Sequence, residues 1–155
     1  MQHTGSRDAP RPKALVVEDD SAISSFIRIC VEQLGYEADA AYDGGAALHA
    51  LREERPAVVF MDLGLPVVRG EELVAFMKSR PDLAQVPVII ISACDLAPDA
   101  DRGLFYLRKP CTVKQIQQAV SAAQEWSKVS QARRSLRPAP VDVGREFLAQ
   151  WLHEG

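Results

Sequence analysis

Short apolar runs alternate with amphipathic segments along most of the chain. The apolar runs cover residues 13–18, 56–62, 86–92 and 104–107, and residues 36–41 form a weaker strand that also contains Glu37 and Asp39. Each has the length of a strand, and a strand that is apolar throughout is typical of a sheet covered on both faces. Helical segments between successive strands make the strands parallel. We therefore predict an α/β fold, a doubly wound five-stranded parallel sheet with helices on both sides.

The segments between the strands carry helix signals. After the first strand, apolar residues recur at helical spacing, at Ile23, Phe26, Ile27, Cys30, Val31 and Leu34. Gly35 follows them as a C-terminal cap, and Asp43 is the expected N-cap of a second helix. Residues 70–79 predict a third helix. A capping-box pattern at residues 112–115 begins a last helix, which we expect to run to about Val129.

The connection between the fourth and fifth strands is unusually short. Only 16 residues separate Ser92 from Lys109, and the fifth strand takes several of them. The rest is acidic, contains Pro98 and Gly103, and has no apolar stripe. We predict that the fourth helix of the usual arrangement is absent or cut to about one turn, which would leave apolar surface open beside the sheet.

Both ends of the chain differ from the segment between them. Residues 1–12 have no periodicity and predict a flexible leader, so we place the main domain at residues 13–128. Residues 129–155 predict a proline-containing linker and an amphipathic C-terminal helix, whose apolar face includes Phe147, Leu148, Trp151 and Leu152. So short a helix is unstable alone. It would dock on its own domain or on a second copy, which would make a homodimer; a disordered tail or a docking peptide for another protein are the alternatives.

Composition and charge narrow the class of protein. The chain is 47% apolar and 25% charged, as in ordinary soluble domains, and no apolar run reaches the ~20 residues that span a bilayer. Three widely spaced cysteines and the lack of an apolar leader favour a cytoplasmic protein. Residues 13–127 carry 11 basic and 17 acidic residues, which argues against direct nucleic-acid binding.

Polar residues gather where the strands end. Glu18 and Asp19 follow the first strand, Asp62 ends the third, Ser92 ends the fourth, and Lys109 follows the fifth. In an open parallel sheet these ends lie along one crevice. Crowded carboxylates need a cation between them, and an oxygen-only cluster suits Mg²⁺. With an ammonium and a hydroxyl opposite, the cluster would stabilise phosphoryl transfer, with Asp62 as the nucleophile that forms an acyl phosphate.

Four motifs carry a family resemblance over residues 13–127. They are LVVEDD, VVFMDLGLP, VIIISA and LRKP, in this order and each at a strand end. Together they resemble the receiver (CheY-like) domain of two-component response regulators. The resemblance implies that Asp62 accepts a phosphoryl group from a histidine kinase or a histidine phosphotransfer protein. It also implies that Asp19 binds Mg²⁺ directly, that Glu18 binds it through water, and that the backbone carbonyl of Gly64 is a further ligand.

The resemblance also implies a switch. Ser92, with Ala93 beside it, would move toward the phosphoryl group, Lys109 would pair with that group, and the Lys109–Pro110 bond would be cis. Tyr106 would swing inward with Ser92, or it is a static aromatic residue; the sequence favours neither reading.

The resulting hypothesis is a stand-alone, non-enzymatic response regulator whose output is contact with a downstream protein. The alternative is a degenerate receiver that binds partners without phosphorylation, which the short crossover favours and the intact Asp62 and Lys109 oppose. A phosphatase with a strand-end nucleophile would need a second Asp where Gly64 stands. A flavin binder would need a hydroxyl-rich phosphate loop where this chain has three acids.

Overall fold

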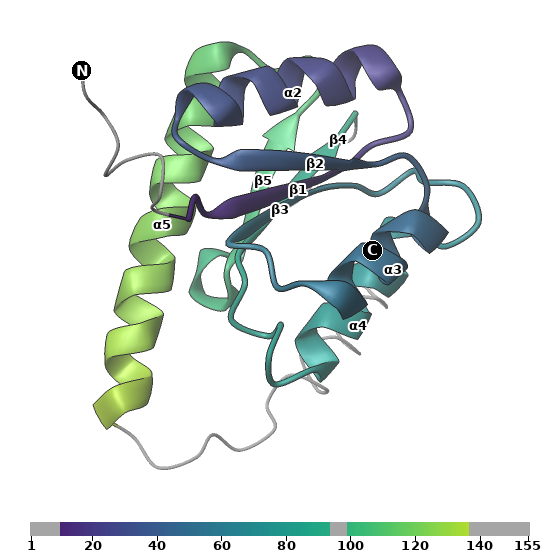
Figure 1. The fold of residues 1–155 in the computed structure, drawn as a ribbon. Helices are drawn as coiled ribbons and strands as arrows, with labels where there is room; N and C mark the ends of the chain where they lie inside the picture. Colours follow the sequence, from purple (N-terminus) through teal and green to yellow (C-terminus); the bar gives the residue numbers. More distant parts are fainter. Residues whose placement is uncertain (1–9, 94–98, 137–155) are drawn as a thin grey trace.

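The computed structural model describes residues 10–93 and 99–136 and contains a single parallel sheet (Figure 1). In chain order the elements are β1 (Lys13–Val17), α2 (Ser21–Gln33), β2 (Glu37–Ala41), α3 (Gly44–Glu53), β3 (Val58–Asp62), α4 (Gly70–Ser79), β4 (Val88–Ser92), the 3₁₀ helix η1 (Ala100–Arg102), β5 (Leu104–Arg108) and α5 (Val113–Leu136). The strand order is β2-β1-β3-β4-β5, with parallel pairing throughout. The predicted five-stranded fold is confirmed.

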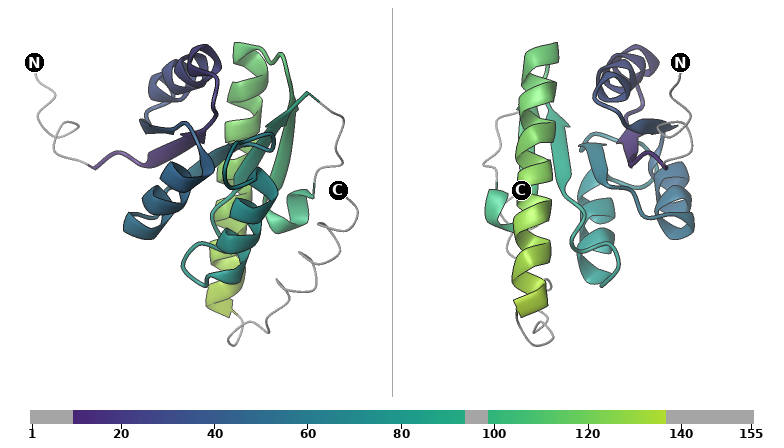
Figure 2. Two further views of the ribbon diagram at one scale, coloured as in Figure 1. Left: turned by 90° about the vertical axis from the view of Figure 1, so that its right-hand side faces the viewer. Right: turned by 60° about the vertical axis from the view of Figure 1, so that its left-hand side comes forward.

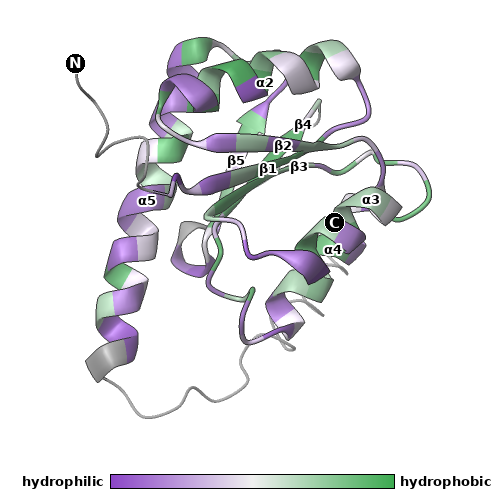
Figure 3. Ribbon diagram, viewed as in Figure 1, coloured by the Kyte–Doolittle hydropathy of each residue, from purple (hydrophilic) through white to green (hydrophobic). Residues whose placement is uncertain are grey.

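Helices cover both faces of the sheet (Figures 1 and 2). Alternate residues of β3 point to opposite faces of the sheet. Val59 and Met61 pack with α3 and α4, and Phe60 packs with α2 and α5. All five β3 residues are buried. Figure 3 shows the matching hydropathy, with hydrophobic residues along the inner strands and both hydrophilic and hydrophobic residues on the helices. Because both faces are covered, β3 has no polar side chain before Asp62.

Side-chain caps hold the starts of three helices. The Asp20 carboxylate accepts the N–H groups of Ala22 and Ile23, and Asp43 accepts that of Ala46. The capping box at the start of α5 is complete, since the N–H of residue 112 donates to the Gln115 side chain at 2.8 Å and the N–H of Gln115 donates back to the Thr112 hydroxyl at 3.2 Å. These caps satisfy backbone donors that no helix can satisfy internally.

The crossover between β4 and β5 is as short as predicted. In the described part of that connection, residue 93 and residues 99–103, the only regular element is the three-residue helix η1. Asp99 and Leu104 exchange two backbone hydrogen bonds of 3.0 Å that close the turn before β5. The predicted loss of a full fourth helix is confirmed.

The last helix is longer than predicted. The expected end near Val129 is wrong, because α5 continues to Leu136 and runs past the edge of the sheet in Figure 1. No Gly or Pro interrupts residues 129–136, and Arg133 and Arg134 suit the negative end of the helix dipole. The predicted tail helix with Phe147, Leu148, Trp151 and Leu152 lies outside the described residues. In the described part of the chain, no helix combines the length and apolar character needed to cross a bilayer.

Candidate phosphoryl-acceptor site

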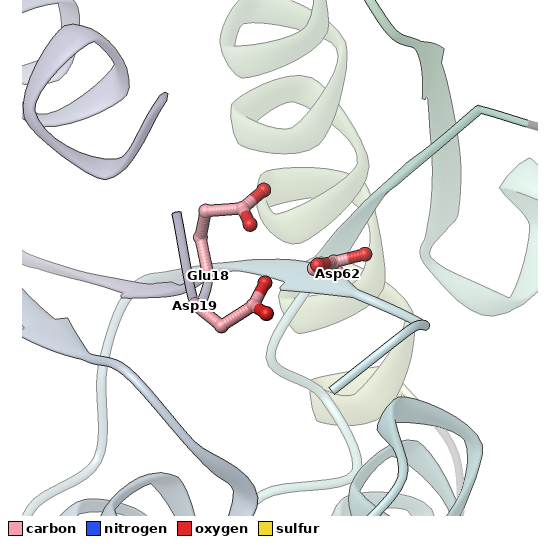
Figure 4. Close-up of side chains that lie close together, drawn as sticks. All are labelled: Glu18, Asp19 and Asp62. Carbon is pink, nitrogen blue, oxygen red and sulfur yellow. The ribbon is translucent and has the colours of Figure 1, made fainter. Parts of the chain in front are cut away.

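Three acids meet at the carboxyl edge of the sheet. Glu18 and Asp19 follow β1, and Asp62 ends β3, the strand paired with β1. One oxygen of each carboxyl group lies within 4.8 Å of the other two, and Figure 4 shows the three groups facing one another. Neighbouring parallel strands that end together bring the acids to one point, as the sequence had indicated.

Asp62 is held firmly at the end of its buried strand. It is 7% exposed, and its Oδ1 accepts the N–H of Gly64 at 3.1 Å. Its Oδ2 lies 3.5 Å from Lys109 Nζ. Gly70, the first residue of α4, approaches so closely that a Cβ there would lie 2.5 Å from the Asp62 backbone oxygen. The sequence analysis missed this contact, for which the glycine at the first position of the helix was a signal.

Glu18 and Lys109 form the shortest ion pair of the site. Lys109 Nζ lies 2.8 Å from Glu18 Oε1, and Glu18 Oε2 accepts the N–H of Asp20 at 3.1 Å. Glu18 is 1% exposed, and this burial raises its pKa to about 7 against the opposing hydrogen bond from Lys109. The exposed Asp19 has a lowered pKa because its carboxylate is hydrogen-bonded by Glu18. Asp19 is therefore the more readily ionised of the two acids.

Lys109 remains a cation in this setting. Its partial burial acts to lower its pKa, but the carboxyl groups of Glu18 and Asp62 outweigh that effect and raise it. The peptide bond from Lys109 to Pro110 is cis. The site thus has three carboxyl groups on one side and one fixed positive charge beside them.

The predicted switch residues lie on the neighbouring strands. Ser92 ends β4, is partly buried, and accepts the backbone N–H of Lys109 at 2.8 Å; Ala93 is exposed. Tyr106 in β5 is partly buried and packs on the core between the sheet, α3 and α4. The roles of Ser92, Ala93, Tyr106 and the Gly64 carbonyl stay predictions.

The donor set fits a hard divalent cation. Three carboxyl groups offer oxygen atoms within 4.8 Å of one another, and the exposed Asp19 leaves room for the water ligands that Mg²⁺ retains. Lys109 lies next to the three carboxyl groups. Its positive charge can neutralise the part of a bound anion's charge that a divalent cation alone would leave unbalanced. This combination suits a phosphoryl group on Asp62.

The family follows from comparison of the sequence with known proteins. The family model described as "Response regulator receiver domain" matches residues 14–121. The chain belongs to the response regulator receiver family. Receiver domains are typically signalling modules without enzymatic activity; they bind Mg²⁺ at an acidic site and interact with histidine kinases and downstream targets.

Curated relatives of this receiver differ in length. The phosphate regulon transcriptional regulatory protein PhoB of Rhizobium meliloti is 31% identical over 140 residues, which are 87% of this chain and 62% of PhoB. Protein Rrf1 of Nitratidesulfovibrio vulgaris is 36% identical over 80 residues, 52% of this chain and 58% of Rrf1. The polar-differentiation response regulator DivK of Brucella anthropi is 34% identical over 108 residues, 66% of this chain and 88% of DivK. The chain therefore spans about three fifths of the first two relatives.

Solved structures share the fold of this receiver. The receiver domain from Methylobacillus flagellatus superposes with a TM-score of 0.64 at 30% identity and covers 74% of this chain and 99% of its own. The chemotaxis response regulator CheY4 of Vibrio cholerae superposes with a TM-score of 0.66 at 22% identity, again over 74% and 99%. The second likeness concerns the fold alone.

Proposed function

We propose that Asp62 accepts a phosphoryl group from a phosphohistidine of a histidine kinase or a histidine phosphotransfer protein. One observation carries the proposal: the buried Asp62 carboxylate lies 3.5 Å from Lys109 and within 4.8 Å of the Glu18 and Asp19 oxygens. In the transfer an Asp62 oxygen forms a bond to phosphorus while the phosphorus–nitrogen bond to the donor histidine breaks, and the electron pair stays on the imidazole.

Each residue of this chain has a part in the proposed step. Asp19 and Asp62, with Glu18 through water and the Gly64 carbonyl, would hold Mg²⁺, which supplies positive charge to the transferring oxygens when it is bound. Lys109 neutralises the remaining charge of the phosphoryl group. The Gly64 N–H orients the Asp62 carboxylate through its 3.1 Å hydrogen bond to Oδ1.

The proposed switch begins at Ser92 and Ala93. The Ser92 hydroxyl would donate to a phosphoryl oxygen, helped by the Ala93 N–H, and Tyr106 would follow into the space that Ser92 leaves. Support comes from the 2.8 Å bond between the Lys109 N–H and the Ser92 carbonyl, since it ties the two residues that would approach the phosphoryl group.

The phosphoryl donor would dock beside the acceptor on an apolar groove. The groove has a volume of about 460 Å³ and is lined by Ala22, Ile23, Phe26, Lys109, Pro110 and Cys111. Phe26 is a large apolar side chain with 38% exposure. A protein that delivers a phosphoryl group to Asp62 must cover the surface around Lys109, and this groove continues from it, so we assign it to a helix of the donor.

We propose output through protein contacts, with DivK as the supporting likeness because this chain covers 88% of it. The proposed receiver begins at residue 13, and its helix α5 moves the proposed end from residue 128 to Leu136.

We place the protein in the cytoplasm, where the free thiols of Cys30 and Cys111 would stay reduced. A tail that docks on its own domain or on a second copy remains part of the proposal.

The second candidate function is a receiver that binds partners without phosphorylation. It is favoured by the β4–β5 crossover, where η1 is the only regular element among the described residues 93 and 99–103, in place of the full helix that the family resemblance led us to expect. Intact acidic residues and Lys109 favour the first proposal.

Acetyl phosphate with Mg²⁺ separates the two functions. We expect intact-mass spectra of the full chain to gain one phosphoryl group, and Asp62→Asn to abolish the gain. Asp20→Asn is the matched control, since it removes a neighbouring carboxylate and keeps the N-cap, and it should be modified normally. An unmodified wild-type chain that also fails to bind beryllofluoride with Mg²⁺, by ¹⁹F NMR, would overturn the proposal and leave the phosphorylation-independent receiver.

A further inference from the structure

Helix α5 ends at the amino edge of the sheet, where the strands begin, on the side opposite the acceptor site. Each helix that follows a parallel strand runs back from the carboxyl edge, so α3, α4 and α5 all end at the amino edge. Helix α5 continues past the sheet to Leu136, as Figure 2 shows. The chain beyond Leu136 therefore starts on the side away from Asp62.

A polar groove joins the last turns of α5 to the end of α3. It has a volume of about 450 Å³, and its lining includes Ser127 and Gln131 of α5 together with Arg55 and Gln85. Gln131 lies five residues before the end of α5 at Leu136, or about 7.5 Å along the helix axis. The chain that follows α5 thus begins close to Arg55.

Beside Arg55 lies a basic surface with an aromatic ring at its centre. The guanidinium carbons of Arg52 and Arg80 lie 5.8 and 5.6 Å from the centre of the Phe76 ring of α4. The hydrogen bond from Arg80 lowers the pKa of Asp82, and the charge of Arg55 adds to this effect, which places Arg55 near the same pair. We call Arg52, Arg55, Phe76 and Arg80 the platform.

The platform has an excess of positive charge. Its arginines at the end of α3 are exposed. The neighbouring acids are engaged elsewhere, since Glu54 binds Lys13 at 2.8 Å and Asp82 binds Arg80 at 3.1 Å. Phe76 packs on the core and is only partly buried, so an apolar side chain can still cover it. The platform therefore suits a partner that offers both carboxylates and aromatic side chains.

The tail of this chain has that composition. Asp142, Glu146 and Glu154 are four and eight residues apart, so the predicted tail helix would carry them along one side. Its predicted apolar face, which includes Phe147 and Trp151, lies beside this acidic side. One helix can thus place carboxylates on the exposed arginines and an aromatic side chain on the centre of the platform.

Other surfaces fit the tail less well. The corner beside the short crossover, where the sequence analysis expected open apolar surface, is occupied by Trp126 and Lys78. The Trp126 ring covers Gly103, where a Cβ would come within 2.6 Å of it, and Lys78 Nζ lies 5.6 Å from the centre of the ring. A groove of about 380 Å³ bordered by β2 and α3 is lined by acids that include Asp39 and Glu53, which repel an acidic helix.

The short linker favours docking within one chain. Residues 137–140 include two prolines and hold the tail near the platform. A short tether gives an effective concentration on the order of millimolar, so a contact too weak to join separate chains is well populated within one chain.

We propose that residues 141–153 dock as a helix on the platform of their own chain, with their acids beside the arginines and Trp151 toward Phe76. The inference rests on the tail docking within the proposed function, and it is independent of the phosphoryl chemistry of the acceptor site. Helix α5 packs on one face of the sheet and α3 and α4 on the other. The docked tail would therefore tie the two helical layers together across the amino edge.

The fluorescence of Trp151 tests the docking in the full chain. Trp126 and Trp151 are the two tryptophans, so Trp126→Phe isolates Trp151. We expect Trp151 of the folded chain to emit at shorter wavelength than in the urea-unfolded chain and to be protected from acrylamide. Both effects should be independent of protein concentration.

Charge reversal locates the docking surface. In the Trp126→Phe background, Arg52→Glu should lower the ratio of docked to undocked tail by about fivefold, because an attraction becomes a repulsion. The measured effect is a shift to longer wavelength and stronger acrylamide quenching. Glu146→Arg should have the same effect, and because it lies in the tail, a folding defect of the domain cannot explain it. Combining both reversals should recover part of the protection.

Lys114→Glu is the matched control, since it makes the same change of charge at an exposed position at the start of α5. It should leave the emission of Trp151 unchanged. Trp151 that is as accessible in the folded chain as in urea, or that responds to neither Arg52→Glu nor Glu146→Arg, overturns the docking.

Protein concentration separates the possible occupants. Protection of Trp151 that appears only as the concentration rises overturns docking within one chain and assigns the platform to the tail of a second copy. Labelling of Asp62 by acetyl phosphate is a separate measurement, so failure of the docking and failure of the acceptor function are distinguished.

Discussion

Lys109 lies closer to Glu18 than to the proposed acceptor Asp62. Its Nζ is 2.8 Å from Glu18 Oε1 and 3.5 Å from Asp62 Oδ2. Glu18 is the most deeply buried acid of the site, so it has the greatest need of a compensating charge. Lys109 therefore stabilises the folded site and is also in reach of a phosphoryl group, and these two roles can be measured apart.

Lys109→Met should destabilise the fold by about 2 kcal/mol above the Glu18 pKa of about 7, because a buried carboxylate loses its cation. This loss of unfolding free energy is smaller than for a fully buried ion pair, because Lys109 is partly exposed to water. Urea unfolding measures it. Adding Glu18→Gln should restore most of the stability but not the phosphorylation by acetyl phosphate. If Lys109→Met destabilised the wild-type chain and the Glu18→Gln chain equally, Lys109 and Glu18 would have no coupling energy.

Gly70→Ala should lower both stability and phosphorylation. Its Cβ would lie 2.5 Å from the Asp62 backbone oxygen and 2.7 Å from Leu63 Cα, so α4 must move off the acceptor loop, at a cost of about 2 kcal/mol. Gly64→Ala is the control in the same loop: its Cβ would make only an ordinary 3.8 Å contact with Asp62, and its stability should stay within about 0.5 kcal/mol of the wild type. Thermal and urea unfolding compare the two; a stable Gly70→Ala chain would contradict the close approach.

Val67→Gly should stabilise the chain. Val67 has φ of 70°, a left-handed conformation that disfavours a β-branched residue, in a turn closed by the Val68 N–H and the Pro66 carbonyl. Its side chain is 86% exposed, so little packing is lost, and relief of strain should outweigh the added flexibility of glycine by about 1 kcal/mol. Val129→Gly, at an exposed helical position, should instead lose stability. A loss at both positions in urea unfolding would refute the strain at Val67.

The stability conferred at Lys78 should depend on pH. Burial lowers the pKa of Lys78 from 10.5 to about 8; Asp99 opposes the shift and Arg102 adds to it. Between these pH values the unfolded chain holds a proton that the folded chain has released, so stability rises with pH. Relative to Lys78→Met, the wild type should gain up to about 3 kcal/mol between pH ~8 and ~10.5. Urea unfolding of both chains across this range tests it; a constant difference would mean that Lys78 is not buried.

The sequence by itself determined the elements and the identity of the site. Apolar runs without polar interruption specify strands covered on both faces, and a carboxylate at the end of such a run has to emerge at the sheet edge. The caps at Asp20, Asp43 and residues 112–115 are interactions between residues two or three positions apart, so they can be predicted from the local sequence. The shortness of the β4–β5 crossover followed from counting residues between Ser92 and Lys109.

Only the tertiary structure decided which of these residues contact one another. From the sequence alone, Lys78 is expected to be a solvated helix lysine, but in the fold α4, η1 and α5 enclose it. Trp126 is expected to be one more apolar residue, but in the fold it lies on Gly103. The preference of Lys109 for Glu18 over Asp62 depends on sub-ångström differences between side chains brought together from distant strands. Periodicity reports which face of an element is buried, but charge pairing and burial of a single side chain depend on neighbours that are distant in the sequence, and only the folded chain brings these together.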